Sequence, residues 1–170
     1  MKHHVNKYSM EEGEEVTKTT KMDLDELLKV LNEAYSEEWL AYYQYWLGAK
    51  LAYGPERPSV VKEFEEHAGE ELKHADWLAN RILQLGGTPA ISPEEWGRLA
   101  HCRYMPPKAA DVLSLVKDNL AAERCAIDRY QRLCDMTEGK DYETFRISRK
   151  ILKEELEHEQ EMEDFLADIG

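Results

Sequence analysis

The sequence predicts an all-α protein, a four-helix bundle built from two antiparallel helical hairpins that one long crossover joins. Glycine and proline are scarce, with nine and six in 170 residues, and they cluster between four long stretches with a helical spacing of apolar residues. Short turns separate the helices within each pair, whereas about twenty residues separate the two pairs. A chain of this length suits one domain with a single continuous core.

The first helix is predicted over about residues 22–53. Asp23 is a suitable N-cap, and Glu26 follows three residues later, as in a capping box. Helix breakers stand directly after the predicted end: Gly54, Pro55 and Pro58. These signals predict a turn at this point and the return of the chain as a second helix.

The second helix is predicted over residues 59–85 and ends at a Gly-Gly pair, a common C-terminal signal. The crossover that follows carries at most a short helix around residues 94–101, and it contains four prolines: Pro89, Pro93, Pro106 and Pro107. The third helix is predicted over residues 109–137 and stops before Gly139, and the fourth over residues 141–169.

Residues 1–21 mix lysine, histidine and glutamate without helical periodicity, which predicts a flexible arm ahead of a bundle domain over residues 22–170. No stretch is long and apolar enough to cross a bilayer. Three cysteines do not make a disulfide scaffold, so we expect a cytoplasmic protein. The net charge of -13 disfavours nucleic acid and anionic membranes as partners and attracts cations.

Each helix carries one carboxylate where its buried stripe should be apolar. Alternate steps of four and three residues trace these stripes, and each contains one glutamate near its middle: Glu38, Glu71, Glu123 and Glu155. On the second and fourth helices a histidine, His74 or His158, follows the glutamate by three residues. Residues three apart share a helix face, so each Glu-x-x-His pair can reach one point.

The height of these residues along the bundle is an independent test. Residues equidistant from the turn of an antiparallel hairpin lie side by side. The midpoint of Glu38 and Glu71 falls at the Gly-Pro turn, and the midpoint of Glu123 and Glu155 falls at Gly139. We therefore expect all six groups at one level of the bundle, provided that the hairpins dock in the usual way.

Four carboxylates in an apolar core need compensation, because burying a lone charge is strongly unfavourable. Two divalent cations cancel four negative charges, and carboxylates with one imidazole per ion suit iron or manganese, and zinc less well. This ligand set is the one found in di-iron carboxylate bundles. The alternative is a bundle with solvated or paired glutamates and ordinary histidines.

The motifs resemble those of the ferritin-like superfamily, and within it the bacterioferritin type of di-iron site. The first helix carries E-W-L-A-Y-Y-Q-Y from Glu38, and the second carries E-L-K-H-A-D-W from Glu71 followed by R-I-L-Q-L-G-G. The resemblance covers about residues 23–169, without much of the crossover. It implies six ligands for two ions, in which Glu71 and Glu155 bridge both. Glu38 with His74, and Glu123 with His158, would complete one ion each.

The same resemblance draws attention to residues around the site. Tyr45 matches a tyrosine beside the family's di-iron site, with core packing as its alternative role. Leu72 stands where bacterioferritins carry the haem-ligating methionine, so no haem is expected. Cys102 and Cys125 resemble the cysteine pair of Dps-like proteins called thioferritins, which implies a redox or disulfide role and a dodecameric cage rather than a 24-mer. The alternative for each cysteine is a buried apolar side chain, which we also expect for Cys134.

The expected function is oxidation of Fe²⁺ by hydrogen peroxide or oxygen at the paired site, with storage of the ferric product in a hollow homo-oligomer and protection against oxidative stress. Each histidine needs an acceptor for its other ring nitrogen, and Glu70 and Asp128 are candidates. The alternatives on the same bundle are a rubrerythrin-like peroxidase without a rubredoxin centre, because no C-x-x-C exists, and a di-manganese catalase. A DNA-compacting Dps-type protein is disfavoured, because glutamates offset the lysines of the arm.

Overall fold

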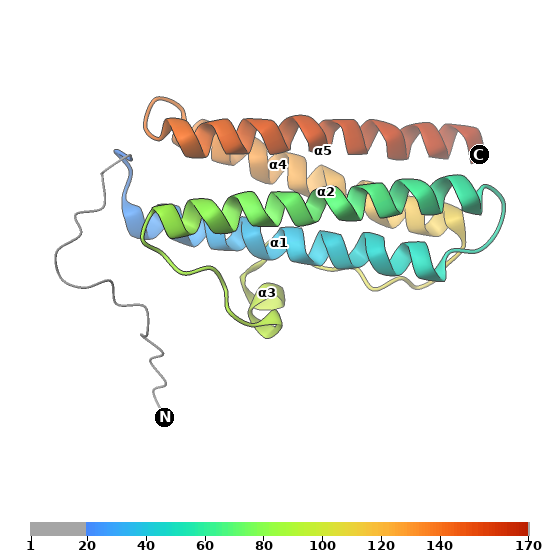
Figure 1. The fold of residues 1–170 in the computed structure, drawn as a ribbon. Helices are drawn as coiled ribbons and strands as arrows, with labels where there is room; N and C mark the ends of the chain where they lie inside the picture. The colour runs from blue at the N-terminus through green and yellow to red at the C-terminus, as the bar shows by residue number, and fades with distance from the viewer. Residues whose placement is uncertain (1–19, 170) are drawn as a thin grey trace.

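The computed structural model describes residues 20–169, which contain five α-helices (Figure 1). In chain order these are α1 Leu24–Leu51, α2 Arg57–Gln84, α3 Pro93–Leu99, α4 Val112–Thr137 and α5 Tyr142–Ile169. The four long helices and the short helix of the crossover lie within a few residues of their predicted positions, which confirms the all-α fold. The predicted arm, residues 1–21, lies outside the described residues except for its last two.

Local capping explains where α1 begins and where α2 ends. Asp23 caps α1, because its side chain accepts a hydrogen bond from the backbone N–H of Glu26 at 2.9 Å, as predicted. Beyond α2, Gly86 adopts a φ of 78°, and the N–H of Gly87 donates to the carbonyl of Ile82 at 2.9 Å. This left-handed conformation is the reason for a glycine at the end of α2.

Two helix starts differ from their predicted positions. The helix α2 begins at Arg57, two residues before its predicted start, so that Pro58 lies in its first turn. Proline is tolerated there, because the N–H that it lacks would have no intrahelical partner in a first turn. The helix α4 begins at Val112, three residues late, because the chain before it pairs with the end of the first hairpin. There the N–H of Tyr53 donates to the carbonyl of Ala110, and the N–H of Val112 donates to the carbonyl of Tyr53, both at 3.0 Å.

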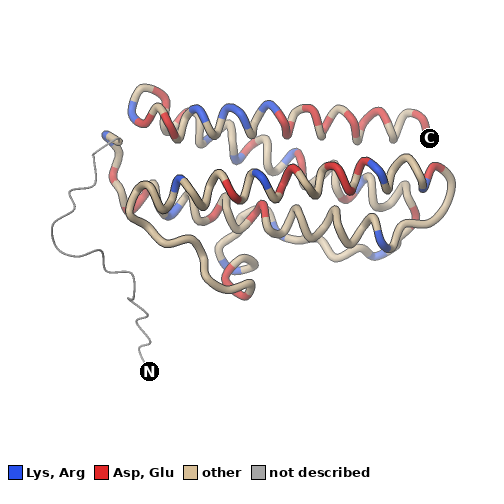
Figure 2. Tube along the Cα trace, in the orientation of Figure 1, with Lys and Arg blue, Asp and Glu red and all other residues tan. Residues whose placement is uncertain are grey.

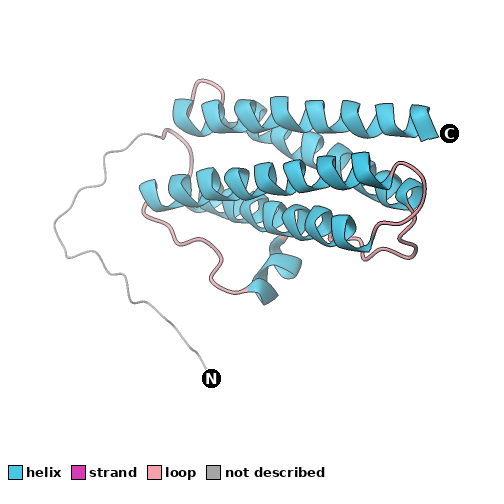
Figure 3. Ribbon diagram, turned by 45° about the vertical axis from the view of Figure 1, so that its right-hand side comes forward, coloured by secondary structure: helices cyan, strands magenta, loops and turns pink. Residues whose placement is uncertain are grey.

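The bundle consists of two hairpins, α1 with α2 and α4 with α5, which dock with α1 beside α4 and α2 beside α5 (Figure 3). One apolar cluster, which includes Phe64 and Met162, fills one end of the core, and a second, which includes Leu31, fills the other. The crossover lies on α1, where Trp96 of α3 stacks on Trp39 with ring centroids 4.8 Å apart. The predicted polar level therefore lies between two apolar clusters.

Charge is unevenly distributed along the bundle (Figure 2). The start of α5 carries most of its basic residues, whereas beyond Lys153 this helix has many acidic residues and no lysine or arginine. Within residues 20–169, no helix combines the length and hydropathy that crossing a bilayer requires.

Candidate metal centre

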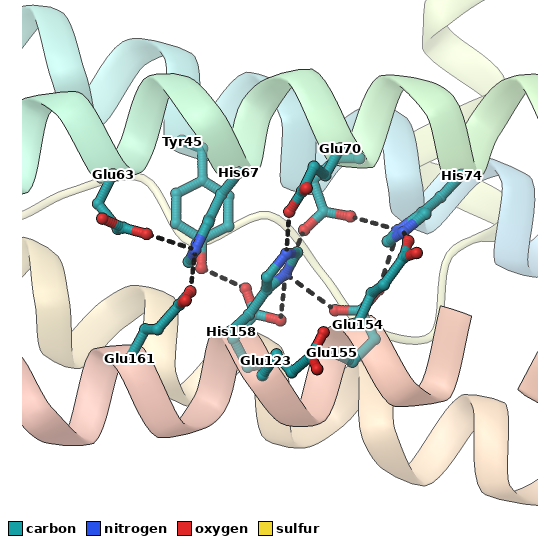
Figure 4. Close-up of polar contacts among 12 residues, drawn as sticks. Tyr45, Glu63, His67, Glu70, His74, Glu123, Glu154, Glu155, His158 and Glu161 are labelled. Atoms are coloured by element: carbon teal, nitrogen blue, oxygen red, sulfur yellow. Dashed lines mark hydrogen bonds and ion pairs between the residues drawn. The ribbon is translucent and has the colours of Figure 1, made fainter. Parts of the chain in front are cut away.

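The six groups singled out from the sequence come together in the middle of the bundle. Each side chain is at most 3% exposed, and one glutamate comes from each long helix, with a histidine from α2 and one from α5 (Figure 4). The set consists of Glu38, Glu71, His74, Glu123, Glu155 and His158. Their assignment as metal ligands stays a prediction.

One half of the centre is gathered around His74. Its Nδ1 atom lies 3.3 Å from Oε2 of Glu38, 3.2 Å from Oε2 of Glu71 and 3.2 Å from Oε1 of Glu155. These four ligand-type atoms from three helices converge on one point, and the four residues form one group that could hold an ion.

The other half repeats this arrangement around His158. Its Nδ1 atom lies 3.5 Å from Oε1 of Glu71, 3.7 Å from Oε2 of Glu123 and 3.6 Å from Oε2 of Glu155. Glu71 and Glu155 thus offer one oxygen to each half. This is the geometry that two bridging carboxylates require.

Hydrogen bonding leaves the centre incompletely satisfied, which is a test of whether cations fit. Several of its buried atoms have no hydrogen-bond partner: Glu38 Oε2, Glu71 Oε1, both carboxylate oxygens of Glu155, and His158 Nδ1. Buried polar groups are normally partnered, and lone pairs that converge without a donor suit a cation. The donor set of oxygens with one imidazole nitrogen per half fits iron or manganese.

The electrostatics of the metal-free centre favour a neutral cluster. Burial opposes charge on both histidines, but the surrounding carboxylates, which accept from a protonated imidazole, outweigh it and raise the pKa of His74 and His158. Burial raises the pKa of Glu38 and Glu123 well above the usual range. For Glu71 and Glu155, burial is outweighed by the close approach of the two imidazoles, which lowers the pKa of both carboxyls. These shifts all reduce the net negative charge of the metal-free centre, because they favour charged imidazoles and neutral carboxyls at Glu38 and Glu123.

The outer nitrogens of both histidines have acceptors across the α2/α5 groove. The Nε2 atom of His158 lies 2.8 Å from Oε2 of Glu70, the acceptor expected from the sequence. For His74 the acceptor is Glu154, at 2.7 Å, which sequence reasoning missed. The other expected acceptor, Asp128, is wrong: it pairs with Arg132 one turn further along α4, at 2.5 Å.

Two tyrosines extend the centre on the opposite side. Tyr45 donates its hydroxyl hydrogen to Glu123, and its ring packs against Phe64, so this residue contacts the candidate centre and also packs in the core. Tyr130 of α4 donates in the same way to Glu38. Tyr130 was not singled out, although its position on the buried stripe, two turns beyond the α4 glutamate, matches that of Tyr45 on α1.

A cavity of about 310 Å³ reaches the centre from the α1/α4 side of the bundle. Alanines and Leu40 line much of it, and it is also lined by four glutamates of the centre: Glu38, Glu71, Glu123 and Glu155. The crossover closes its outer wall, where Cys102 forms a disulfide with Cys125. Cys134 is buried and free, as expected.

Together the fold and the centre define a class of protein: a four-helix bundle with a buried carboxylate–histidine cluster between its hairpins. The sequence profile of the ferritin-like domain matches residues 28–170. This chain therefore belongs to the ferritin-like family.

Similar proteins come from both archaea and bacteria. A DNA protection during starvation protein of Pyrococcus furiosus is 34% identical over 92% of this chain and 85% of its own. A bacterioferritin of Streptomyces coelicolor is 30% identical over 78% and 75%. Among solved structures, a bacterioferritin-related protein of Bacteroides fragilis, described as a dodecameric thioferritin, is 52% identical with a TM-score of 0.86, over 88% of this chain and 89% of its own.

Proposed function

We propose that this protein binds two iron ions between its hairpins, oxidises Fe²⁺ there, and stores the ferric product. The proposal rests on the positions of Glu71 and Glu155, because each of them directs one carboxylate oxygen to each half of the centre. Several buried atoms of this centre have no hydrogen-bond partner. Glu38 with His74 would complete one ion, and Glu123 with His158 the other.

Bound Fe²⁺ supplies the reducing electrons, one from each ion, and hydrogen peroxide needs two to become water. The protein contributes charge and position. Four carboxylates would neutralise the two cations, and the neutral imidazoles would bind through Nδ1, while Glu154 and Glu70 accept the hydrogens on Nε2. Such pairing of ligand and outer acceptor fixes the orientation of each ring before iron arrives.

The cavity on the α1/α4 side gives a small oxidant access to the centre. Its lining is mostly apolar and its volume, about 310 Å³, admits molecules much larger than hydrogen peroxide or oxygen. The resemblance to thioferritins favours hydrogen peroxide. Parallel assays with each oxidant, on the same iron-loaded sample, decide between them.

A hollow homo-oligomer would hold the product, and we propose a dodecamer. The support is the 52% identity to the Bacteroides fragilis protein that is described as dodecameric. Size-exclusion chromatography with light scattering distinguishes a dodecamer from a 24-mer or a dimer. A dimer would contradict storage in a cage.

The central test follows ferric absorbance after Fe²⁺ and oxidant are mixed with the protein. The double variant Glu71→Ala/Glu155→Ala should lose the fast phase, because both ions lose their shared ligands. The matched control is Glu66→Ala/Glu157→Ala, on the same two helices, whose side chains are 55% and 57% exposed. Equal rates in wild type and the first variant would refute the proposal.

Three other functions have distinct outcomes. Elemental analysis that finds manganese rather than iron would favour a catalase, and peroxide turnover without iron accumulation would favour a rubrerythrin-like peroxidase. The name of the Pyrococcus furiosus relative raises DNA protection, against which stands the net charge of -13. A gel shift at low salt tests this, and we expect free DNA.

A further inference from the structure

The cavity on the α1/α4 side of the centre is larger than hydrogen peroxide or oxygen needs. Its volume is about 310 Å³. Pockets that bind small organic molecules begin at roughly 300 Å³, whereas both of these oxidants would pass through a narrow channel. The volume therefore points to a reactant with an organic body.

Small and apolar side chains create this space. They come from α1, the crossover and α4: Leu40, Ala41, Met105, Ala121, Ala122 and Ala126. Apart from the thioether of Met105, none of these side chains has a polar atom. A wall of this kind stabilises a hydrocarbon group, because it removes apolar surface from water without leaving polar groups unpaired.

The wall also contains Gln44, but the amide of this residue is already hydrogen-bonded within the protein. Its Nε2 atom donates to Oδ1 of Asn119 at 3.1 Å and to the carbonyl oxygen of Asp118 at 3.4 Å. Its Oε1 atom accepts from the backbone N–H of Met105 at 3.1 Å. Gln44 thus holds the crossover against α1 and α4, and both of its amide hydrogens are used.

Glu37, a further residue of the wall, is satisfied in the same way. Its Oε1 atom accepts from the backbone N–H groups of His101, at 2.7 Å, and Cys102, at 3.2 Å. Its Oε2 atom accepts from Nε of Arg129 at 3.0 Å. Glu37 and Gln44 therefore support the wall, and a reactant in the cavity is held mainly through apolar contact.

The cavity connects the centre with the surface. Two of its lining residues, His101 and Arg103, are exposed, and the four buried glutamates of the centre also line it. On the other side of the centre, Glu70 and Glu154 accept hydrogen bonds from the two histidines (Figure 4). Those carboxylates do not suit a hydrocarbon group. An apolar reactant is therefore expected to approach from the α1/α4 side.

We propose that this cavity admits organic hydroperoxides, with the alkyl or aryl group against the alanine-rich wall and the O–O group at the centre. The inference rests on the proposed function, because Fe²⁺ is the reductant. Two Fe²⁺ ions supply one electron each, and solvent supplies two protons. The O–O bond breaks, so that one oxygen leaves as the alcohol and the other as water, and two Fe³⁺ ions remain.

Anaerobic oxidation of Fe²⁺ by tert-butyl hydroperoxide and by cumene hydroperoxide tests the reaction. With two Fe²⁺ per subunit, ferric absorbance should rise at rates comparable to the rate with hydrogen peroxide. Chromatography should find one molecule of alcohol for every two ions oxidised, and little of the ketone that one-electron cleavage produces. Fast oxidation by hydrogen peroxide alone would overturn this inference and leave the proposed function standing. Slow oxidation by all three oxidants would refute both.

A narrower cavity should separate the oxidants. In Ala126→Leu the added side chain fills part of the wall, so oxidation by cumene hydroperoxide should slow about ten-fold or more, as excess bulk does in an apolar pocket. Oxidation by hydrogen peroxide should keep its rate, which also shows that the variant is folded. The matched control is Ala167→Leu, at an exposed position on α5. An equal effect on both oxidants in Ala126→Leu would contradict binding in the cavity.

Binding can be tested without iron. Metal-free crystals soaked in 2-phenyl-2-propanol, the alcohol formed from cumene hydroperoxide, should show this molecule against Leu40 and Ala126. Crystals of Ala126→Leu should not bind it, and those of Ala167→Leu should. An empty cavity in the soaked wild type would overturn the proposal.

Discussion

Tyr130 donates its phenolic hydrogen to Glu38, from the opposite hairpin and 92 positions away in the chain. Tyr45 makes the same contact with Glu123 in the reverse direction. Each hairpin thus supplies a tyrosine that donates a hydrogen bond to a glutamate of the other hairpin, Glu38 or Glu123. These two hydrogen bonds couple the docking of the hairpins to the orientation of the carboxylates.

Replacing these tyrosines should affect the metal-free protein most. In Tyr130→Phe the buried carboxyl of Glu38 loses its donor, so we expect a destabilisation of about 1–3 kcal/mol. With metal bound the loss should be smaller, because the cation also satisfies Glu38. Chemical denaturation with and without Co²⁺ measures both values, with Tyr53→Phe, at an exposed tyrosine, as the control. An equal loss in the two states would contradict this role.

Metal binding should release protons. The raised pKa values of the two histidines and of Glu38 and Glu123 mean that all four groups lose protons when cations bind. We expect about four protons per subunit for two ions, and an affinity that rises steeply with pH. Titration in weakly buffered solution, with indicator dye or pH-stat, measures the number. Release of no protons would show that the centre is already charged when empty.

The glutamates that accept hydrogen bonds from the outer nitrogens of the two histidines should each affect the affinity for one ion. Glu154→Gln removes the charged partner of His74, and Glu70→Gln that of His158, so each should lower metal affinity by about 10- to 100-fold at its own half. Asp128→Asn is the control, because its carboxylate contacts only the α4 surface arginine in the described structure. Isothermal titration with Co²⁺ resolves the two steps. A loss as large in Asp128→Asn would point to a general charge effect.

The disulfide should stabilise the wall of the cavity. Cys102 and Cys125 are 23 residues apart in the chain. Closing a loop of this length lowers the entropy of the unfolded chain and so raises its free energy by about 3 kcal/mol. Reduction, or Cys102→Ser, should lower stability by that order and increase hydrogen exchange in the crossover around His101 to Met105. The same exchange rates in oxidised and reduced protein would show that the crossover is held by its other contacts.

His67 should make the metal-free protein sensitive to acid. Burial, reinforced by the charge of His158, lowers the pKa of His67 to about 4. The unfolded chain binds this proton near pH 6.5 and the folded one does not, so stability is lost as pH falls from about 6.5 to about 4. The loss is on the order of 3 kcal/mol. His67→Leu should remove it, and identical pH profiles for both proteins would contradict the low pKa.

Periodicity was enough to predict the six residues of the centre. The steps of four and three residues selected Glu38, Glu71, Glu123 and Glu155 because a helix repeats its faces regularly, whatever surrounds it. Their common height followed from the position of each turn. The expectation that Glu70 accepts a hydrogen bond from the outer nitrogen of one of the histidines also succeeded, whereas the same expectation for Asp128 was wrong, because the outer nitrogen of His158 faces α2 rather than α4.

The sequence by itself determined the helices, their turns, and which carboxylates and histidines share one level, since all of these depend on spacing along a single hairpin. Only the tertiary structure decided how the hairpins face each other. The contacts Tyr130–Glu38, His74–Glu154 and His67–Glu161 each join helices of different hairpins. Their formation depends on the rotation of each helix about its own axis at the docked interface, and no local pattern in the chain encodes that rotation.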